Sequence, residues 1–86
     1  MKQKLTTSKL TSLEQLTEAI EIGLDIEFFI SDERYNISWR NNKPFICVCP
    51  DGDAVFYKNA DDLLHNHLIN GIPVKDLWQD IEVYSM

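Results

Sequence analysis

Two short clusters in this sequence carry the residue types that bind zinc. Cys47 and Cys49 stand two positions apart, and so do His65 and His67. Two thiolates and two imidazoles are a ligand set that tetrahedral zinc accepts, but structural sites prefer two to four residues between the cysteines. Two histidines at this spacing on a helix also point about 200° apart. We therefore predict free thiols, surface histidines and no bound cofactor, and keep a zinc-dependent activity as a third alternative.

Other candidates for catalysis or ion binding lack part of the pattern that they need. Asp51 and Asp53 flank Gly52, but Val55 takes the fifth position of a calcium loop, where an oxygen ligand is needed. No serine lies in a G-x-S-x-G motif, and the three glycines stand alone, so no nucleophile elbow or phosphate loop is indicated. A chain of 86 residues also has little volume for an enclosed substrate pocket. The sequence predicts a protein that is not an enzyme.

The most distinctive chemical feature is a run of carboxylates without a base among them. Residues 10–33 contain seven acids and no Lys or Arg, in a chain whose net charge is −6. A surface of one sign attracts basic partners and repels phosphate backbones, so direct binding to nucleic acid is not expected. The acids of this run are Glu14, Glu18, Glu21, Asp25, Glu27, Asp32 and Glu33.

The same composition predicts where the chain acts. No apolar run approaches the ~18 residues that a membrane-spanning helix needs, and the lysines near the N-terminus precede no apolar stretch, so neither a membrane span nor a signal peptide is predicted. The two cysteines of such a chain are expected to stay reduced, and we predict a cytoplasmic location.

The first element that must position the acids is a helix. Ser12 and Gln15 have the spacing of a capping box, and Gly23 suits the left-handed residue that follows a helix. Between these ends the apolar residues recur at spacings of three and four, as a buried stripe requires. They are Leu13, Leu16 and Ile20, and the glutamates at 14, 18 and 21 are expected on the opposite, solvated face.

A four-stranded antiparallel meander is expected next. Alternation with period two, or a short apolar run, marks strands over 24–30, 34–40, 45–49 and 54–58. Turn residues separate them at 31–33, 41–44 and 50–53. The outward arginines of the second strand, at 34 and 40, are expected to face Asp25 and Glu27 across the first pair.

Two short helices are predicted to complete the fold. Asn59 caps a helix over 60–67, Asn70 and Gly71 form a tight turn, and Pro73 opens a third helix over 73–81. Residues 82–85 could add an edge strand. Residues 1–9 are interpreted as a flexible tail ahead of one domain over 10–86. The fold class is α+β: an N-terminal helix, the meander, and two short helices packed on one sheet face.

Phe29 is the candidate apolar anchor of a binding surface. It stands on the acid-bearing face of its strand, and Phe45, Cys47 and Cys49 are expected near it on other strands. An exposed apolar patch ringed by carboxylates is typical of a protein interface. Phe29 and the seven acids are therefore the predicted partner-binding residues.

Much of the chain resembles small uncharacterised acidic proteins of low-GC Gram-positive bacteria and their phages. The resemblance covers about residues 24–82 and rests on the RYNIS segment at 34–38, on NADDLL at 59–64 and on INGIPVKDLW at 69–78. In size and charge alone the chain is similar to the anti-CRISPR inhibitors of phages. That similarity implies a protein that mimics nucleic-acid charge and occupies the basic groove of an effector.

Two functional interpretations follow from these features. The first is a non-catalytic protein-binding module, an inhibitor or regulator from a phage or mobile element, whose acidic surface engages a basic protein partner. The second is a small structural or housekeeping domain that self-associates through its sheet, giving a homodimer, and whose acids serve only solubility.

Overall fold

Six strands form one antiparallel sheet in the computed structural model, which describes residues 7–86. The strand order is β1-β8-β2-β3-β4-β5, and a separate hairpin pairs β6 with β7. The strands are β1 Ser8–Lys9, β2 Ile26–Ile30, β3 Glu33–Arg40, β4 Lys43–Val48, β5 Val55–Phe56, β6 Leu68–Ile69, β7 Ile72–Pro73 and β8 Glu82–Ser85. The helices are α1 Leu13–Glu21, α2 Ala60–Asn66 and two 3₁₀ turns, η1 Val74–Asp76 and η2 Trp78–Asp80. Within residues 7–86 no helix has the length and apolar character to cross a bilayer.

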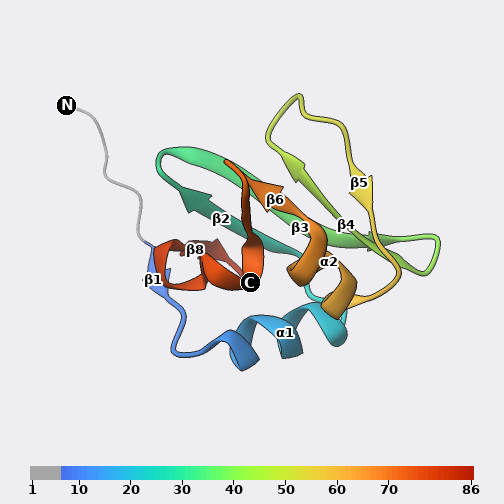
Figure 1. Ribbon diagram of the computed structural model, residues 1–86, viewed down its shortest axis with the longest axis horizontal. Helices are drawn as coiled ribbons and strands as arrows, with labels where there is room; N and C mark the ends of the chain where they lie inside the picture. Colours follow the sequence, from blue (N-terminus) through green and yellow to red (C-terminus); the bar gives the residue numbers. More distant parts are fainter. Residues whose placement is uncertain (1–6) are drawn as a thin grey trace.

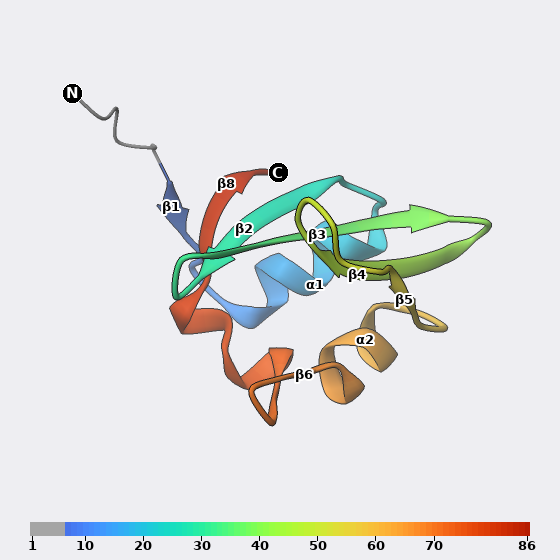
Figure 2. The same ribbon diagram turned by 90° about the horizontal axis from the view of Figure 1, so that it is seen from above.

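The sheet separates an apolar face from an outer face. Alternate residues of β2 and β3 are buried on the side where α1 and α2 lie, among them Ile26, Phe28 and Ile37 (Figures 1 and 2). Their neighbours in sequence point to the other side, which we call the outer face and which no helix covers (Figure 2). The predicted α+β class, with helices on one face of the sheet, is confirmed.

Both ends of α1 are capped as the sequence predicts. The Gln15 N–H donates to Ser12 Oγ at 3.1 Å, and Gln15 Oε1 accepts from the Thr11 N–H at 2.7 Å. At the other end Gly23 has φ +85°, and its N–H donates to Ile20 O while the next N–H reaches back to Ala19 O. These paired bonds are a Schellman motif, so α1 is held at both ends.

Two-residue turns set the register of the β2–β3 and β3–β4 hairpins. Ser31 and Asp32 have φ of 49° and 68°, and Asn41 and Asn42 have φ of 55° and 65°. Turns with two positive φ values match the twist of antiparallel strands. The predicted turns at 31–33 and 41–44 were therefore too long, because the residue after each pair already belongs to the next strand.

The prediction of a four-stranded sheet was wrong, because both ends of the described chain add strands. β8 is not at an edge: it lies between β1 and β2, and Val83 pairs with Ser8 on one side and Phe28 on the other. Residues 8 and 9 of the predicted tail are therefore part of the sheet, and residues 1–6 lie outside the described residues. Period-two alternation identifies strands but not their neighbours.

The predicted third helix over 73–81 is instead two 3₁₀ turns that meet at Leu77. The Leu77 N–H donates to Val74 O, and the Ile81 N–H donates to Trp78 O, so each turn closes over three residues. A period of three stacks Val74 and Leu77 on one side, and both are buried. The cap of α2 is as predicted, since the Asp62 N–H donates to Asn59 Oδ1 at 2.8 Å, but the helix ends one residue earlier, at Asn66.

Trp39 joins the sheet to α1. Its indole Nε1 donates to the Ile20 carbonyl at 2.7 Å, and this oxygen lies in the last turn of the helix. Trp78 also packs against the core, but its indole makes no hydrogen bond within residues 7–86. The two tryptophans therefore form a matched pair that differs in this bond.

We expect Trp39→Phe to lower the free energy of unfolding by about 1 kcal/mol more than Trp78→Phe does, because it removes one of the two hydrogen bonds that the Ile20 carbonyl accepts. Urea unfolding followed by far-ultraviolet circular dichroism measures both. Equal losses in the two variants would show that the bond contributes nothing beyond packing.

Candidate functional site

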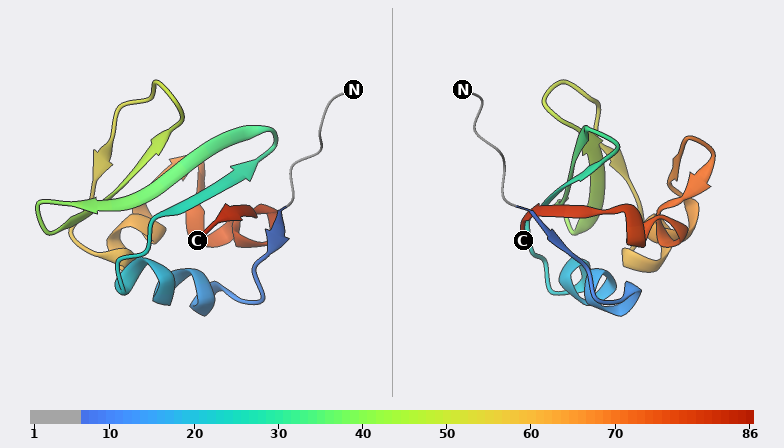
Figure 3. Two further views of the ribbon diagram at one scale, coloured as in Figure 1. Left: turned by 180° about the vertical axis from the view of Figure 1, so that it is seen from behind. Right: turned by 90° about the vertical axis from the view of Figure 1, so that its left-hand side faces the viewer.

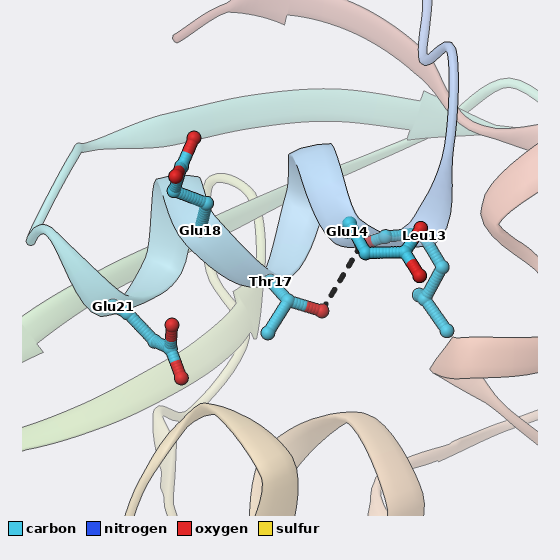
Figure 4. Close-up of a pocket in the computed structure, with 5 residues that line it drawn as sticks. All are labelled: Leu13, Glu14, Thr17, Glu18 and Glu21. Atoms are coloured by element: carbon cyan, nitrogen blue, oxygen red, sulfur yellow. Dashed lines mark hydrogen bonds between the residues drawn. The ribbon is translucent and has the colours of Figure 1, made fainter.

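Three glutamates line one side of α1. Glu14, Glu18 and Glu21 are exposed, and with Leu13 and Thr17 they surround a shallow hollow of about 310 Å³ (Figure 4). At 100° per residue the three glutamates fall within about 60° of one another around the helix. The buried residues Leu16, Ala19 and Ile20 occupy the opposite side. We call these three glutamates the acidic ridge.

The acidic ridge has no cationic partner within residues 7–86. The ion pairs there are Arg34 with Glu27 and Lys75 with Asp76, and neither involves α1. The ridge also sits on a helix whose two ends are capped and whose other side is packed in the core. A fixed array of like charges results, and its field is available to an incoming basic surface.

The other predicted acids lie elsewhere. Glu27 is on the outer face of the sheet, where it pairs with Arg34, and this hydrogen-bonded carboxylate raises the pKa of the guanidinium. Asp25 accepts a hydrogen bond from Asn36 Nδ2 at 2.7 Å. Asp32 and Glu33 are exposed at the end of the β2–β3 hairpin. The structure therefore does not gather the seven acids on one surface.

The expected pairing of outward arginines with acids holds for one arginine only. Arg34 meets Glu27, whereas Arg40 lies over the ring of Phe45, with its Cζ 5.1 Å from the ring centroid. Asp25, which precedes β2, accepts a hydrogen bond from Asn36 and does not meet an arginine. The negative charge of β2 is thus partly neutralised, while that of α1 is not.

Phe29 is less available than the sequence predicts. It is half-buried on the outer face, and its ring meets Tyr84 of β8 edge-on, with the centroids 6.1 Å apart. Arg34 Cζ lies 5.0 Å from the centroid of the same tyrosine ring. The tyrosine comes from a strand that the sequence could not place beside β2, so its cover over Phe29 could not be foreseen.

Sequence reasoning missed Ile22, the most exposed large apolar side chain within residues 7–86. This residue ends α1 and is 66% exposed, next in sequence to Glu21. It follows Glu18 by four positions, which places the two side chains on neighbouring parts of the same helix surface. That spacing was the available signal. Ile22 therefore replaces Phe29 as the exposed apolar group beside the acidic ridge.

The cysteines and histidines do not converge. Cys47 points to the outer face, and burial and the nearby Cys49 thiol raise the pKa of Cys47. His65 is exposed and hydrogen-bonds the Asp61 carbonyl through Nδ1, whereas His67 Nδ1 is 2.8 Å from the Tyr57 hydroxyl. Across residues 7–86 no three His, Cys, Asp or Glu side chains are grouped to hold a metal ion. Within residues 7–86 the two neighbouring thiols thus lack the further ligands that a zinc site needs.

Comparisons of the chain with protein-family models, with curated proteins and with solved structures find no match. The resemblance to small Gram-positive and phage proteins therefore stays a prediction. A proposal for the function of the chain therefore rests on the acidic ridge and on the outer face of the sheet.

Burial makes the charge of His67 depend on folding. Desolvation lowers its pKa below the value of about 6.5 that a histidine has in an unfolded chain. At a pH between the two pKa values the unfolded state binds more protons than the folded state does. The contribution of His67 to the free energy of unfolding is therefore complete above pH ~6.5 and falls as the pH decreases toward the pKa of the folded state. We expect the free energy of unfolding to decline between about pH 7.5 and pH 5.5.

We expect His67→Gln to flatten this decline, because the partly buried titrating group is gone. His65→Gln is the matched control at an exposed histidine of the same segment. Urea unfolding at a series of pH values measures the slope for each variant. A wild-type slope in His67→Gln would assign the pH dependence to other groups.

Proposed function

We propose that this chain is a non-catalytic protein-binding module that engages a basic protein partner through the acidic ridge. The observation that carries the proposal is that Glu14, Glu18 and Glu21 share one exposed side of a capped helix and have no cationic partner within residues 7–86. Ile22 supplies an exposed apolar group at the end of the ridge. Charge surrounding a small apolar contact is typical of transient protein interfaces.

The acidic ridge is suited to attract and select a partner more than to hold one tightly. Exposed ion pairs contribute about 0–1 kcal/mol each because solvent screens them. Their long-range field instead raises the rate of encounter and excludes acidic partners, within a Debye length of about 8 Å at physiological salt. We infer that affinity depends on apolar contacts such as Ile22, and that the glutamates decide which proteins approach.

The partner class that fits best is a protein whose basic surface normally binds nucleic acid. Three carboxylates along one side of a helix present regularly spaced negative charges, as a phosphate backbone does. With the small size of the chain and its net charge of −6, this supports an inhibitor or regulator of phage or mobile-element origin. The remaining predicted acids, on β2 and the β2–β3 hairpin, would act as secondary contacts.

We expect neutralising the ridge with E14Q, E18Q and E21Q together to reduce capture of basic proteins from a host lysate by roughly tenfold, equivalent to ~1.4 kcal/mol. Capture by the wild type should also decline as salt is raised, because the attraction is screened. Immobilised protein with quantitative mass spectrometry of the retained proteins provides the measurement.

A matched control removes the same charge elsewhere on the surface. D51N, D53N and D80N together change three exposed acids that lie outside α1, and circular dichroism checks that both triple variants fold. Retention of the same basic proteins by both variants would refute a specific role for the ridge.

The outer face of the sheet favours self-association as a second candidate. Helices cover only the other face, and the outer face carries the Phe29–Tyr84 and Phe45–Phe56 ring contacts, with Tyr84 41% and Phe56 42% exposed. Aromatic side chains that remain partly exposed on an open sheet could be covered by a second copy.

If the second candidate is correct, light scattering should give a molar mass twice that of one chain, and Tyr84→Lys should halve it. Met86→Lys is the control, since Met86 has the same 41% exposure but lies beyond the last strand. A monomeric wild type at about 0.1 mM, well above typical dimer dissociation constants, would eliminate this candidate.

A further inference from the structure

The closed end of the β3–β4 hairpin reaches one end of the molecule (Figures 2 and 3). The side chains of this region line a basic hollow. Its volume is about 440 Å³, and the residues that line it are Arg40, Asn41, Lys43 and Phe56. None of them is acidic, although the chain has fourteen acids and eight bases. The charge of this hollow is therefore opposite to that of the protein as a whole.

The two cations of the basic hollow oppose each other directly. Arg40 and Lys43 are register partners that flank the Asn41–Asn42 turn, and neither forms an ion pair within residues 7–86. Like charges directly opposite on antiparallel strands are destabilising. A local arrangement that costs stability, with no acidic group to offset it, is typical of functional positions. An anion bound between the two side chains would remove the repulsion.

Aromatic rings complete the hollow on the same face of the sheet. Phe45 and Phe56 are register partners with centroids 5.4 Å apart, and Arg40 Cζ lies 5.1 Å from the Phe45 centroid. A guanidinium in cation–π contact with a ring still has N–H groups that can donate to an anion. Phe56 is 42% exposed and lines the hollow, so it offers an apolar surface beside the two cations.

We propose that the basic hollow binds a small aromatic phosphate, whose phosphate lies between Arg40 and Lys43 and whose ring packs on Phe56. The volume falls within the range of roughly 300–1,000 Å³ that is usual for small-molecule sites. The net charge of −6 disfavours a long polyanion, because such a ligand would also meet the acidic surfaces. A compact dianion is repelled only weakly by acids that lie farther from the hollow than the Debye length. The site is separate from the acidic ridge and does not depend on it.

Titration of the ¹⁵N-labelled full chain with three probes tests the proposal by nuclear magnetic resonance. We expect phenyl phosphate and adenosine monophosphate to shift amide signals of the β3–β4 hairpin and β5, and to bind at least about fivefold more tightly than inorganic phosphate. The shared chemistry is an aromatic ring that carries a phosphate, and the stronger of the two ligands identifies a simple aryl phosphate or a nucleotide as the preferred form. Added sodium chloride should weaken both.

Substitutions in the basic hollow test whether phenyl phosphate binds there. R40Q and K43Q should each weaken phenyl phosphate about tenfold, the loss expected from one charge-assisted hydrogen bond. F56L should weaken phenyl phosphate but not inorganic phosphate. K75Q is the control, because Lys75 is bonded to Asp76 away from the hollow. Thermal unfolding confirms that each variant folds.

Three results would overturn the proposal. The first is the absence of localised shifts with phenyl phosphate up to about 10 mM, a concentration beyond that of millimolar binding. The second is inorganic phosphate binding as tightly as phenyl phosphate, which would leave no role for Phe56. The third is a loss in K75Q equal to that in R40Q, which would indicate attraction by net charge alone.

Discussion

Burial of a single face of the sheet is the constraint on which the rest of this structure depends. Phe28, Ile37 and Ile46 of the sheet and Leu16, Ile20 and Leu63 of the helices are almost fully buried in one apolar layer, and no polar or charged residue within 7–86 is buried. Every charge must therefore lie on the far side of a helix, on the outer face of the sheet or at a turn. The possible binding surfaces follow from that division.

The division separates charges that are mixed along the chain. The acidic ridge belongs to the helix layer, whereas Arg34, Arg40 and Lys43 belong to the outer face, so the protein has two surfaces of different character despite its net charge of −6. Screening over about 8 Å keeps the two surfaces electrostatically distinct even in a molecule of this size. The proposed basic partner and the proposed small anion would therefore meet different sides of the molecule.

Local chemistry was predictable because its causes lie within a few residues. The caps of α1 and α2, the positive φ of Gly23, the Asn70–Gly71 turn and the position of the acidic ridge all follow from spacings of three to five residues. The 3₁₀ turns were not predictable in this way, because a short segment with Val74, Leu77 and Ile81 buried satisfies more than one helical period. Period alone does not choose between an α-helix and two tighter turns.

The sequence by itself determined that β2, β3, β4 and β5 are strands, where α1 and α2 begin and which face of α1 carries the glutamates, because backbone capping and side-chain periodicity act over short distances. Only the tertiary structure decided that β8 enters between β1 and β2, that Tyr84 covers Phe29, and that Phe56 stands beside Arg40 and Lys43. Those contacts join residues far apart in the chain, and strand pairing selects such neighbours through packing of the whole sheet rather than through any local pattern.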